Sequence, residues 1–193
     1  MNERGTAPER SATNWTVTKS DVVIETPFLR LRRDQIELPS GQVVADYYVR
    51  ESRGFAVVFA LTPDERVVLV RQYKHGIGAH VLELPAGAID PGELPADCAR
   101  RELAEETGYV ADPAELELAG SFVFDPTGST TRYHVYVGRN ARPLVPTAFD
   151  ATEDIAIELA TIDELRAMVR DGRIDVGTHV ASVYYVLDRL ARL

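Results

Sequence analysis

The stretch that decides the fold is residues 87–109, GAIDPGELPADCARRELAEETGY. Its second half has the spacing of one amphipathic helix. Small apolar residues recur three and four positions apart and form a stripe that suits a core: Ala96, Ala99 and Leu103. Pro95 suits the first helical turn, and Gly108 suits the position just past a helix end. The sequence therefore predicts a helix between these two residues, with one face packed inward.

A second face of this expected helix is acidic. Glu102, Glu105 and Glu106 are also three and four positions apart. Like charges at this spacing repel by roughly 0.2–0.5 kcal/mol per pair, which a pairing of Arg101 with Glu105 offsets in part. Such a face is either a solvated surface laced with ion pairs or a seat for a hard divalent cation. Carboxylate oxygens on one rigid face suit Mg²⁺, which proteins hold with a few carboxylates plus substrate phosphates.

The residues before the helix favour the second interpretation. A glycine-bearing loop, residues 88–94, runs into the helix and brings backbone groups close to the acidic face. The loop and helix together resemble the Nudix box at its fixed charged and glycine positions: Gly87, Glu93, Arg101, Glu102, Glu105, Glu106 and Gly108. One position departs from the pattern, because Tyr109 stands where that family usually has an aliphatic residue. This change concerns packing and leaves the chemistry untouched.

The resemblance implies an α/β (α+β) fold, an α/β/α sandwich with a mixed sheet, over residues 54–193. Hydrophobic patterning places strands at residues 55–61, 67–73, 81–84, 116–124, 133–137 and 155–159. Two later helices are expected. One starts at a capping box of Thr161 with Glu164, and the other spans residues 178–192. An apolar stripe is assigned to the second of these helices: Val180, Val183, Tyr184, Leu187 and Leu190.

The N-terminal quarter reads differently. Residues 1–13 are polar and are expected to be a mobile tail. Residues 14–53 show short strands with a turn signal at Pro39 and predict a small antiparallel β extension. N-terminal strands of this kind build the dimer in the Nudix enzymes that hydrolyse ADP-ribose. The resemblance therefore implies a homodimer formed through these strands.

The resemblance also implies roles for single residues. Glu102 and Glu106 are the expected metal ligands, with Glu105 next and the carbonyl of Ala86 as a further ligand. The expected cofactor is Mg²⁺, for which Mn²⁺ can substitute. A pair of Glu93 with Arg101 and two glycines, Gly87 and Gly108, are the expected structural supports of the loop.

The catalytic base is left open between several carboxylates. Enzymes of the ADP-ribose branch commonly carry an acidic residue in the loop that here spans residues 128–132, and this segment has none. Glu153 or Asp154 in the next loop, or Glu105 on the helix, are the alternatives. The expected catalytic set is Glu105, Glu106 and Glu153, although each candidate base could equally be a solvated surface carboxylate.

The expected reaction is hydrolysis of ADP-ribose to AMP and ribose 5-phosphate. Pro126, downstream of the box, resembles a marker of the ADP-ribose branch, although it could be an ordinary loop proline. Arg71 is a candidate phosphate contact or a strand-end surface charge, and Phe28 stacks on a base or simply packs. Two alternatives stay open. One is the same chemistry on another nucleoside diphosphate sugar such as GDP-mannose, and the other is a non-catalytic Nudix-like binding module.

Composition narrows the class of protein. At 193 residues with a net charge of −9, the chain suits one domain with a small extension and argues against nucleic-acid or anionic-membrane partners. A phosphate-rich substrate would be repelled by that charge unless bound cations reverse its sign locally. Cys98 is the only cysteine, so a reducing, cytoplasmic location is expected. No signal-peptide core and no run of transmembrane length is evident.

Overall fold

The computed structural model describes residues 14–149 and 154–191. This part of the chain forms two compact units. One consists of residues 14–52 with Thr127–Thr130, and the other begins at Arg53 and holds the rest. The tail expected at residues 1–13 lies outside the described residues. That residues 14–53 and 54–193 fold as separate domains stays a prediction.

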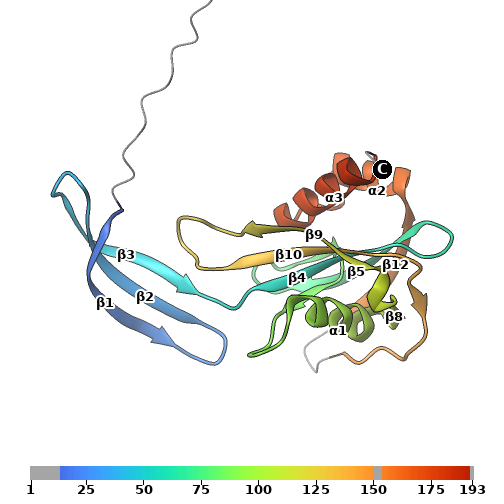
Figure 1. Cartoon of the computed structure of the whole chain (residues 1–193), viewed down its shortest axis with the longest axis horizontal. Helices are drawn as coiled ribbons and strands as arrows, with labels where there is room; N and C mark the ends of the chain where they lie inside the picture. Colours follow the sequence, from blue (N-terminus) through green and yellow to red (C-terminus); the bar gives the residue numbers. More distant parts are fainter. Residues whose placement is uncertain (1–13, 150–153, 192–193) are drawn as a thin grey trace, which may run out of the picture. The chain divides into compact units, whose positions relative to one another are not determined.

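The first unit is a three-stranded antiparallel sheet in the order β1-β2-β3, seen in blue to cyan in Figure 1. Its strands are β1 (Thr16–Glu25), β2 (Arg30–Glu37) and β3 (Val43–Glu51). The loop Thr127–Thr130 pairs with the end of β3, because Arg50 N donates to the Gly128 carbonyl at 2.8 Å and Tyr47 Oη donates to the Thr127 carbonyl at 2.7 Å. The antiparallel N-terminal extension predicted from the sequence is confirmed.

The second unit contains two main sheets and three α-helices. Its strands are β4 (Phe55–Ala60), β5 (Arg66–Lys74), β6 (Ala79–Glu83), β7 (Ala86–Ala88), β8 (Tyr109–Val110), β9 (Leu116–Val123), β10 (Arg132–Gly138), β11 (Arg142–Pro143) and β12 (Ile155–Thr161). Its helices are α1 (Pro95–Thr107), the short 3₁₀ helix η1 (Pro113–Glu115), α2 (Ile162–Arg170) and α3 (Gly177–Leu190). The sheet orders are β7-β4-β10-β9 and β12-β5-β6, with β8 and β11 paired separately. Because β4 is parallel to β10 and antiparallel to β7, the sheet is mixed, as predicted.

The core lies on both sides of β4, whose side chains alternate between two hydrophobic clusters. Val57 and Phe59 pack into the cluster that α2 and α3 cover. Ala56 and Val58 pack into the cluster that α1 covers, against Leu103. Figure 1 shows α1 on one side of the sheet and α2 with α3 on the other. This is the α/β/α sandwich expected from the sequence.

The helix ends follow local signals. Pro95 occupies the first turn of α1, and Gly108 closes the helix with φ 70° and an N–H donated to the Ala104 carbonyl at 2.8 Å. At α2, Thr161 and Glu164 form the predicted capping box, in which each side chain accepts from the backbone N–H of the other. These boundaries need only neighbouring residues, which is why the sequence predicts them well.

Two details differ from the sequence-based expectation. Ala86–Ala88 forms the short strand β7 on β4, so the loop before α1 begins later than the pattern indicates. A three-residue strand is too short to show an alternating pattern. On α3, Tyr184 is 55% exposed, whereas Val186 is completely buried. The apolar stripe of this helix is therefore centred on Val183, Val186 and Leu187, and the assignment of Tyr184 to it was wrong.

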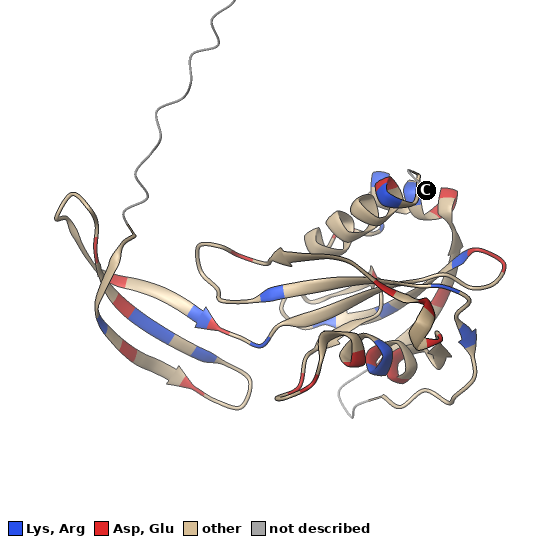
Figure 2. Cartoon of the chain, in the orientation of Figure 1, with Lys and Arg blue, Asp and Glu red and all other residues tan. Residues whose placement is uncertain are grey.

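Charged side chains of both signs occur on both units (Figure 2). In the first unit they form local pairs, such as Arg32 with Asp34 at 2.9 Å. In the second unit, acidic and basic residues gather on α1 and the loop before it. Within residues 14–149 and 154–191, no helix combines the length and the apolar character needed to cross a membrane.

Candidate active site

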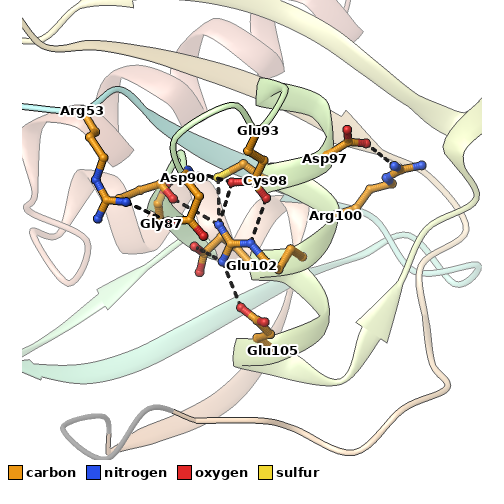
Figure 3. Close-up of polar contacts among 11 residues, drawn as sticks. Arg53, Gly87, Asp90, Glu93, Asp97, Cys98, Arg100, Glu102 and Glu105 are labelled. Carbon is orange, nitrogen blue, oxygen red and sulfur yellow. Dashed lines mark hydrogen bonds and ion pairs between the residues drawn. The ribbon is translucent and has the colours of Figure 1, made fainter.

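Arg101 makes most of the polar contacts between α1 and the preceding loop. Figure 3 labels its partners Glu93, Glu102 and Glu105. Its Nε and Nη2 donate to the two oxygens of Glu93 at 2.9 and 3.0 Å, so the predicted pairing with Glu93 is present. Its Nη1 donates to Glu102 Oε1 at 2.7 Å and to Glu105 Oε2 at 3.0 Å. Nη2 also reaches the Ala88 carbonyl at 3.1 Å. One guanidinium therefore joins the loop to the acidic face of the helix.

The pairing with Arg101 fixes the charge of Glu93. Hydrogen bonds from Arg101 lower the pKa of Glu93 to about 2, against the opposing effect of burial. Glu93 in turn raises the pKa of Arg101. The Glu93 carboxylate also accepts the backbone N–H of Asp90 at 2.9 Å. Glu93 and Arg101 are both ionised at neutral pH, and their two hydrogen bonds hold the loop on α1, which suits the predicted structural role.

Glu102 and Glu106 are the two least exposed carboxylates of the acidic face. The Glu102 side chain is 13% exposed, and the Glu106 residue is 3% exposed. Glu106 Oε2 accepts the N–H of Ala86 at 3.0 Å, which links the helix to the start of β7. The remaining carboxylate, Glu105, is more open, with 43% of its side chain exposed. The acidic face is therefore least exposed at Glu102 and Glu106 and most exposed at Glu105.

Gly87 allows the loop to approach Glu102 closely. A Cβ atom at this position would stand 2.0 Å from Glu102 Cδ, a distance that no pair of non-bonded carbon atoms adopts. Gly108 is needed for two reasons, since its φ is 70° and a Cβ there would lie 2.5 Å from the Val145 carbonyl oxygen. Both glycines of the predicted supports are therefore required by the geometry of the loop and the helix end.

A cavity of about 420 Å³ lies over this face. Its lining contains the backbone of the loop start, the acidic face and several polar side chains: Ala86, Gly87, Ala88, Glu102, Glu105, Glu106, Asp90, Ala148, Arg53, Gln72, Lys74 and Arg101. The structure therefore brings together the expected metal ligands, Ala86, Glu102, Glu105 and Glu106, in the lining of one cavity. A cavity of this size with convergent polar groups is the usual form of a small-molecule site.

Several lining residues were missed by the sequence analysis, among them Gln72, Lys74 and Arg53. Gln72 and Lys74 reach the cavity from β5, and Arg53 reaches it from the start of the second unit. Arg53 Nη1 is 2.7 Å from Asp90 Oδ1 (Figure 3), and Lys74 Nζ is 3.1 Å from Glu83 Oε2. Alternation along β5 is the signal that could have found Gln72 and Lys74, because a strand sends every second side chain to the same face.

Arg71, the residue chosen from the sequence, is placed elsewhere on β5. Its Nε donates to Glu158 Oε1 on β12 at 2.6 Å, and it is not among the described residues that line the cavity. Phe28, 91% exposed, lies in the β1–β2 turn, and Pro126 is exposed in the loop after β9. Roles in substrate binding for these three residues stay predictions. Glu153 lies outside the described residues.

The donor atoms of this site fit a hard divalent cation, although they are not gathered around one point. Among the described residues, no three His, Cys, Asp or Glu side chains form a ready cation cluster. Arg101 draws Glu102 and Glu105 toward itself, while the Ala86 N–H binds Glu106. The atoms available to bind a cation are all oxygens. The Glu102 carboxylate occupies the space in which a side chain at position 87 would otherwise lie. Oxygen donors of this kind suit Mg²⁺ and Mn²⁺.

Cys98 is a buried residue of α1 whose thiol makes a structural contact with the strand before the loop. It is completely buried, and its Sγ donates to the Gly87 carbonyl at 3.4 Å. Burial, together with the nearby charges of Glu102 and Glu93, raises the pKa of the thiol to about 12. The thiolate, which is the nucleophilic form, is therefore scarce at neutral pH.

Comparison with known proteins places this geometry in a family. The sequence model of the NUDIX domain matches residues 51–178, and that of the nucleoside diphosphate sugar hydrolase N-terminal domain matches residues 15–49. A methanol dehydrogenase activator from Bacillus methanolicus is 31% identical over 169 residues, covering 87% of this chain and 90% of its own. An ADP-ribose pyrophosphatase from Bacillus subtilis is 28% identical over 156 residues, covering 80% and 83%.

A solved structure supports the fold. The crystal structure of an ADP compounds hydrolase superposes with a TM-score of 0.84 and 20% identity, covering 94% of this chain and 97% of that one. At this identity the likeness speaks for the fold alone. Together with the two domain matches and the loop–helix geometry, it shows that the chain belongs to the NUDIX family, as a Nudix hydrolase with a nucleoside diphosphate sugar hydrolase N-terminal domain.

Proposed function

We propose that this Nudix nucleoside diphosphate sugar hydrolase acts on ADP-ribose and gives AMP and ribose 5-phosphate. The observation that carries the proposal is the cavity that Glu102, Glu105 and Glu106 line together with Ala86 and Gly87. The relative from Bacillus subtilis named an ADP-ribose pyrophosphatase, which aligns over 80% of this chain, favours ADP-ribose among nucleoside diphosphate sugars.

Charge at the cavity suits a diphosphate. The chain carries a net charge of −9, yet three cationic side chains line this one cavity: Arg53, Lys74 and Arg101. Arg101 is committed to Glu93, whereas Lys74 is half-exposed and held by Glu83 at 3.1 Å. A phosphate oxygen near Lys74 and Arg53 would gain charge-assisted hydrogen bonds. These two side chains are the proposed phosphate contacts.

The carboxylates that line the same cavity are the proposed metal ligands. Glu102 and Glu106, with Glu105 and the Ala86 carbonyl as further donors, would hold Mg²⁺ or Mn²⁺. When bound, such an ion supplies charge neutralisation at the diphosphate and lowers the pKa of a bound water. For this to occur, Glu102 or Glu105 must turn from the Arg101 guanidinium, which keeps its two bonds to Glu93.

A carboxylate base completes the proposed reaction. Water adds to one phosphorus of the diphosphate, the bridging P–O bond breaks, and the base accepts the proton that the water loses. Glu105 and Asp154 are the candidates among the described residues, and Glu105 is favoured because it lines the cavity whereas Asp154 does not. Glu153, which lies outside the described residues, is the remaining candidate.

We also propose that the chain works as a homodimer through β1, β2 and β3, in a cytoplasmic, reducing setting that suits its single buried thiol. Apolar side chains on β1 stand open to solvent, including Val17 at 54% and Ile24 at 43% exposed. Exposed apolar residues in this number on one strand favour a partner surface. A monomer at micromolar concentration by light scattering would contradict this assembly.

The test of the activity is a substrate panel. Purified protein with Mg²⁺ is offered ADP-ribose, GDP-mannose and other nucleoside diphosphate sugars, and phosphate monoester products are separated by chromatography. The proposal expects AMP and ribose 5-phosphate, with the highest kcat/KM for ADP-ribose. A clear preference for GDP-mannose would reassign the substrate within the same chemistry. Tight binding of a nucleotide sugar without turnover would instead indicate a binding module.

A further inference from the structure

A buried polar cluster lies behind the turn that leads into the cavity wall. At its centre is Glu83, the last residue of β6, which is 5% exposed. Its Oε2 accepts Gln72 Nε2 at 3.1 Å and pairs with Lys74 Nζ at 3.1 Å, while its Oε1 lies 3.3 Å from His179 Nε2. A buried carboxylate is tolerated only when it is paired in this way. The cluster therefore joins β5, β6 and the first turn of α3.

His179 uses both of its ring nitrogens. Its Nδ1 accepts the backbone N–H of Leu84 at 3.3 Å, so the proton must be on Nε2, which donates it to Glu83. Burial lowers the pKa of His179 to about 4, a stronger effect than the neighbouring Glu83 charge, which acts in the opposite direction. The ring is therefore neutral near pH 7 and is fixed in one tautomer by its two partners.

The turn after Glu83 is held from three elements. Leu84 is bound through its N–H by His179 of α3. The Pro85 carbonyl accepts the N–H of Val58 of β4 at 2.9 Å. The Ala86 N–H donates to Glu106 of α1 at 3.0 Å. Leu84, Pro85 and Ala86 thus each have a partner in a different element. Of these partners, His179 is the most distant in sequence from the turn.

We propose that His179 is a positioning residue for the cation face of the cavity, acting through the Leu84–Ala86 turn on the Ala86 carbonyl and the Glu106 carboxylate. This inference rests on the proposed metal site. If the Leu84 N–H loses its acceptor, the turn loses one of its three anchors, and the Ala86 N–H that orients Glu106 moves with it. Helix α3, which contributes no residue to the cavity lining among the described residues, would then help to set the cation affinity of the site.

The test measures binding of Mn²⁺ alone to the full chain, by the loss of the free-ion signal in electron paramagnetic resonance. His179→Ala is expected to weaken Mn²⁺ binding by about tenfold or more, the usual cost of removing a group that orients a metal ligand. Val186→Ala is the matched control, because Val186 is also completely buried on α3 and lies about two helical turns beyond His179. It is expected to lower the melting temperature but to leave Mn²⁺ affinity unchanged.

A second measurement reads the turn directly. Amide hydrogen exchange at Leu84 and Ala86 is expected to accelerate in His179→Ala and to stay at the wild-type rate in Val186→Ala. Two isosteric variants refine the result and also serve if His179→Ala does not fold. His179→Asn keeps an acceptor oxygen where Nδ1 stands, and His179→Gln keeps a donor toward Glu83. We expect His179→Asn to restore more of the Leu84 protection and Mn²⁺ affinity than His179→Gln does.

The outcomes separate this inference from the proposed function. Equal loss of Mn²⁺ affinity in His179→Ala and Val186→Ala, or unchanged exchange at Leu84 and Ala86 in His179→Ala, would overturn the positioning role. A wild-type chain that binds no Mn²⁺ would overturn the proposed metal site itself. In that case, Leu84 exchange in the His179 variants would still show whether this side chain holds the turn.

Discussion

The segment from β6 to α1 and the N-terminal sheet differ in how far their side chains find partners within the chain. From Glu83 to Glu106, the charged and polar groups that adjoin the cavity find partners within the second unit, as Arg101 does with Glu93, Glu102 and Glu105. In the sheet β1-β2-β3, only β2 is paired on both edges, and apolar side chains such as Val17 and Ile24 remain exposed. The first region thus has its polar partners within one chain, and the second leaves exposed the apolar surface proposed for a second chain.

The largest effect is expected at Glu106, the most buried carboxylate of the acidic face. Glu106→Gln keeps the shape and an acceptor for the Ala86 N–H, but it removes the charge. We expect kcat/KM to fall by roughly a hundredfold or more, as for loss of a group that acts on charge in the transition state, with little change in melting temperature. The exposed Glu37→Gln on β2 is the control and should leave activity unchanged. Activity within a few-fold of wild type would remove Glu106 from the metal site.

A smaller effect is expected at Gly87, where the backbone comes close to the Glu102 carboxylate. Gly87→Ala would place a Cβ 2.0 Å from Glu102 Cδ, so the loop or the carboxylate must shift. We expect a loss of roughly 1–3 kcal/mol in the free energy of unfolding, as for overpacking, together with weaker Mn²⁺ binding. Urea denaturation and metal titration measure the two. Gly76→Ala is the control, since nothing lies within 4 Å of a Cβ there. Equal stability of both variants would show that the loop is less constrained than described.

The sheet β1-β2-β3 gives a test of the proposed homodimer. Ile24→Lys puts a charge on the apolar surface of β1, where Ile24 is 43% exposed. If this surface is a dimer interface, a buried unpaired charge should weaken the dimer by several kcal/mol and shift light scattering toward the monomer mass. Val123→Lys is the control in the second unit, at 46% exposure on β9. A monomeric wild type, or equal effects of the two substitutions, would remove the sheet from the proposed interface.

The smallest effect concerns pH. Since the pKa of His179 falls from 6.5 to about 4 on folding, the unfolded chain binds more protons between these values, and stability falls as pH drops through this range. The slope from this residue is at most about 1.4 kcal/mol per pH unit. Glu93, with a pKa lowered from 4.5 to about 2, adds a loss below pH 4.5. His179→Asn should flatten the stability profile between pH 6.5 and 4 in urea denaturation, and an unchanged profile would contradict the assignment.

The sequence predicts the acidic face and the helix ends because both depend on local spacing. Glu102, Glu105 and Glu106 share one side of a helix by periodicity alone, and Gly108 ends it through its own φ of 70°. The alternation of β4 between two hydrophobic clusters likewise follows from a buried strand between helices. These features required no knowledge of which distant segments meet.

The rest of the site depends on contacts across the chain. His179 meets Leu84 from 95 residues away, and a single histidine on a helix gives no sign of such a partner. Arg71 was chosen from the sequence as a phosphate contact for its guanidinium. Lys74 lines the cavity with Gln72, two positions from it on β5, whereas Arg71 pairs with Glu158. The chemistry of a side chain was therefore a weaker guide than its place in the strand alternation.

The central claim is that Glu102 and Glu106 hold a divalent cation beside the Ala86 carbonyl. The direct measurement is a crystal structure of the protein soaked with Mn²⁺ and a non-hydrolysable ADP-ribose analogue, with anomalous data collected at the manganese edge. The account predicts an anomalous peak within ligand distance of these carboxylates, with Arg101 still bound to Glu93. Density for the analogue in the cavity without any such peak, and with Arg101 still bridging Glu102 and Glu105, would contradict it.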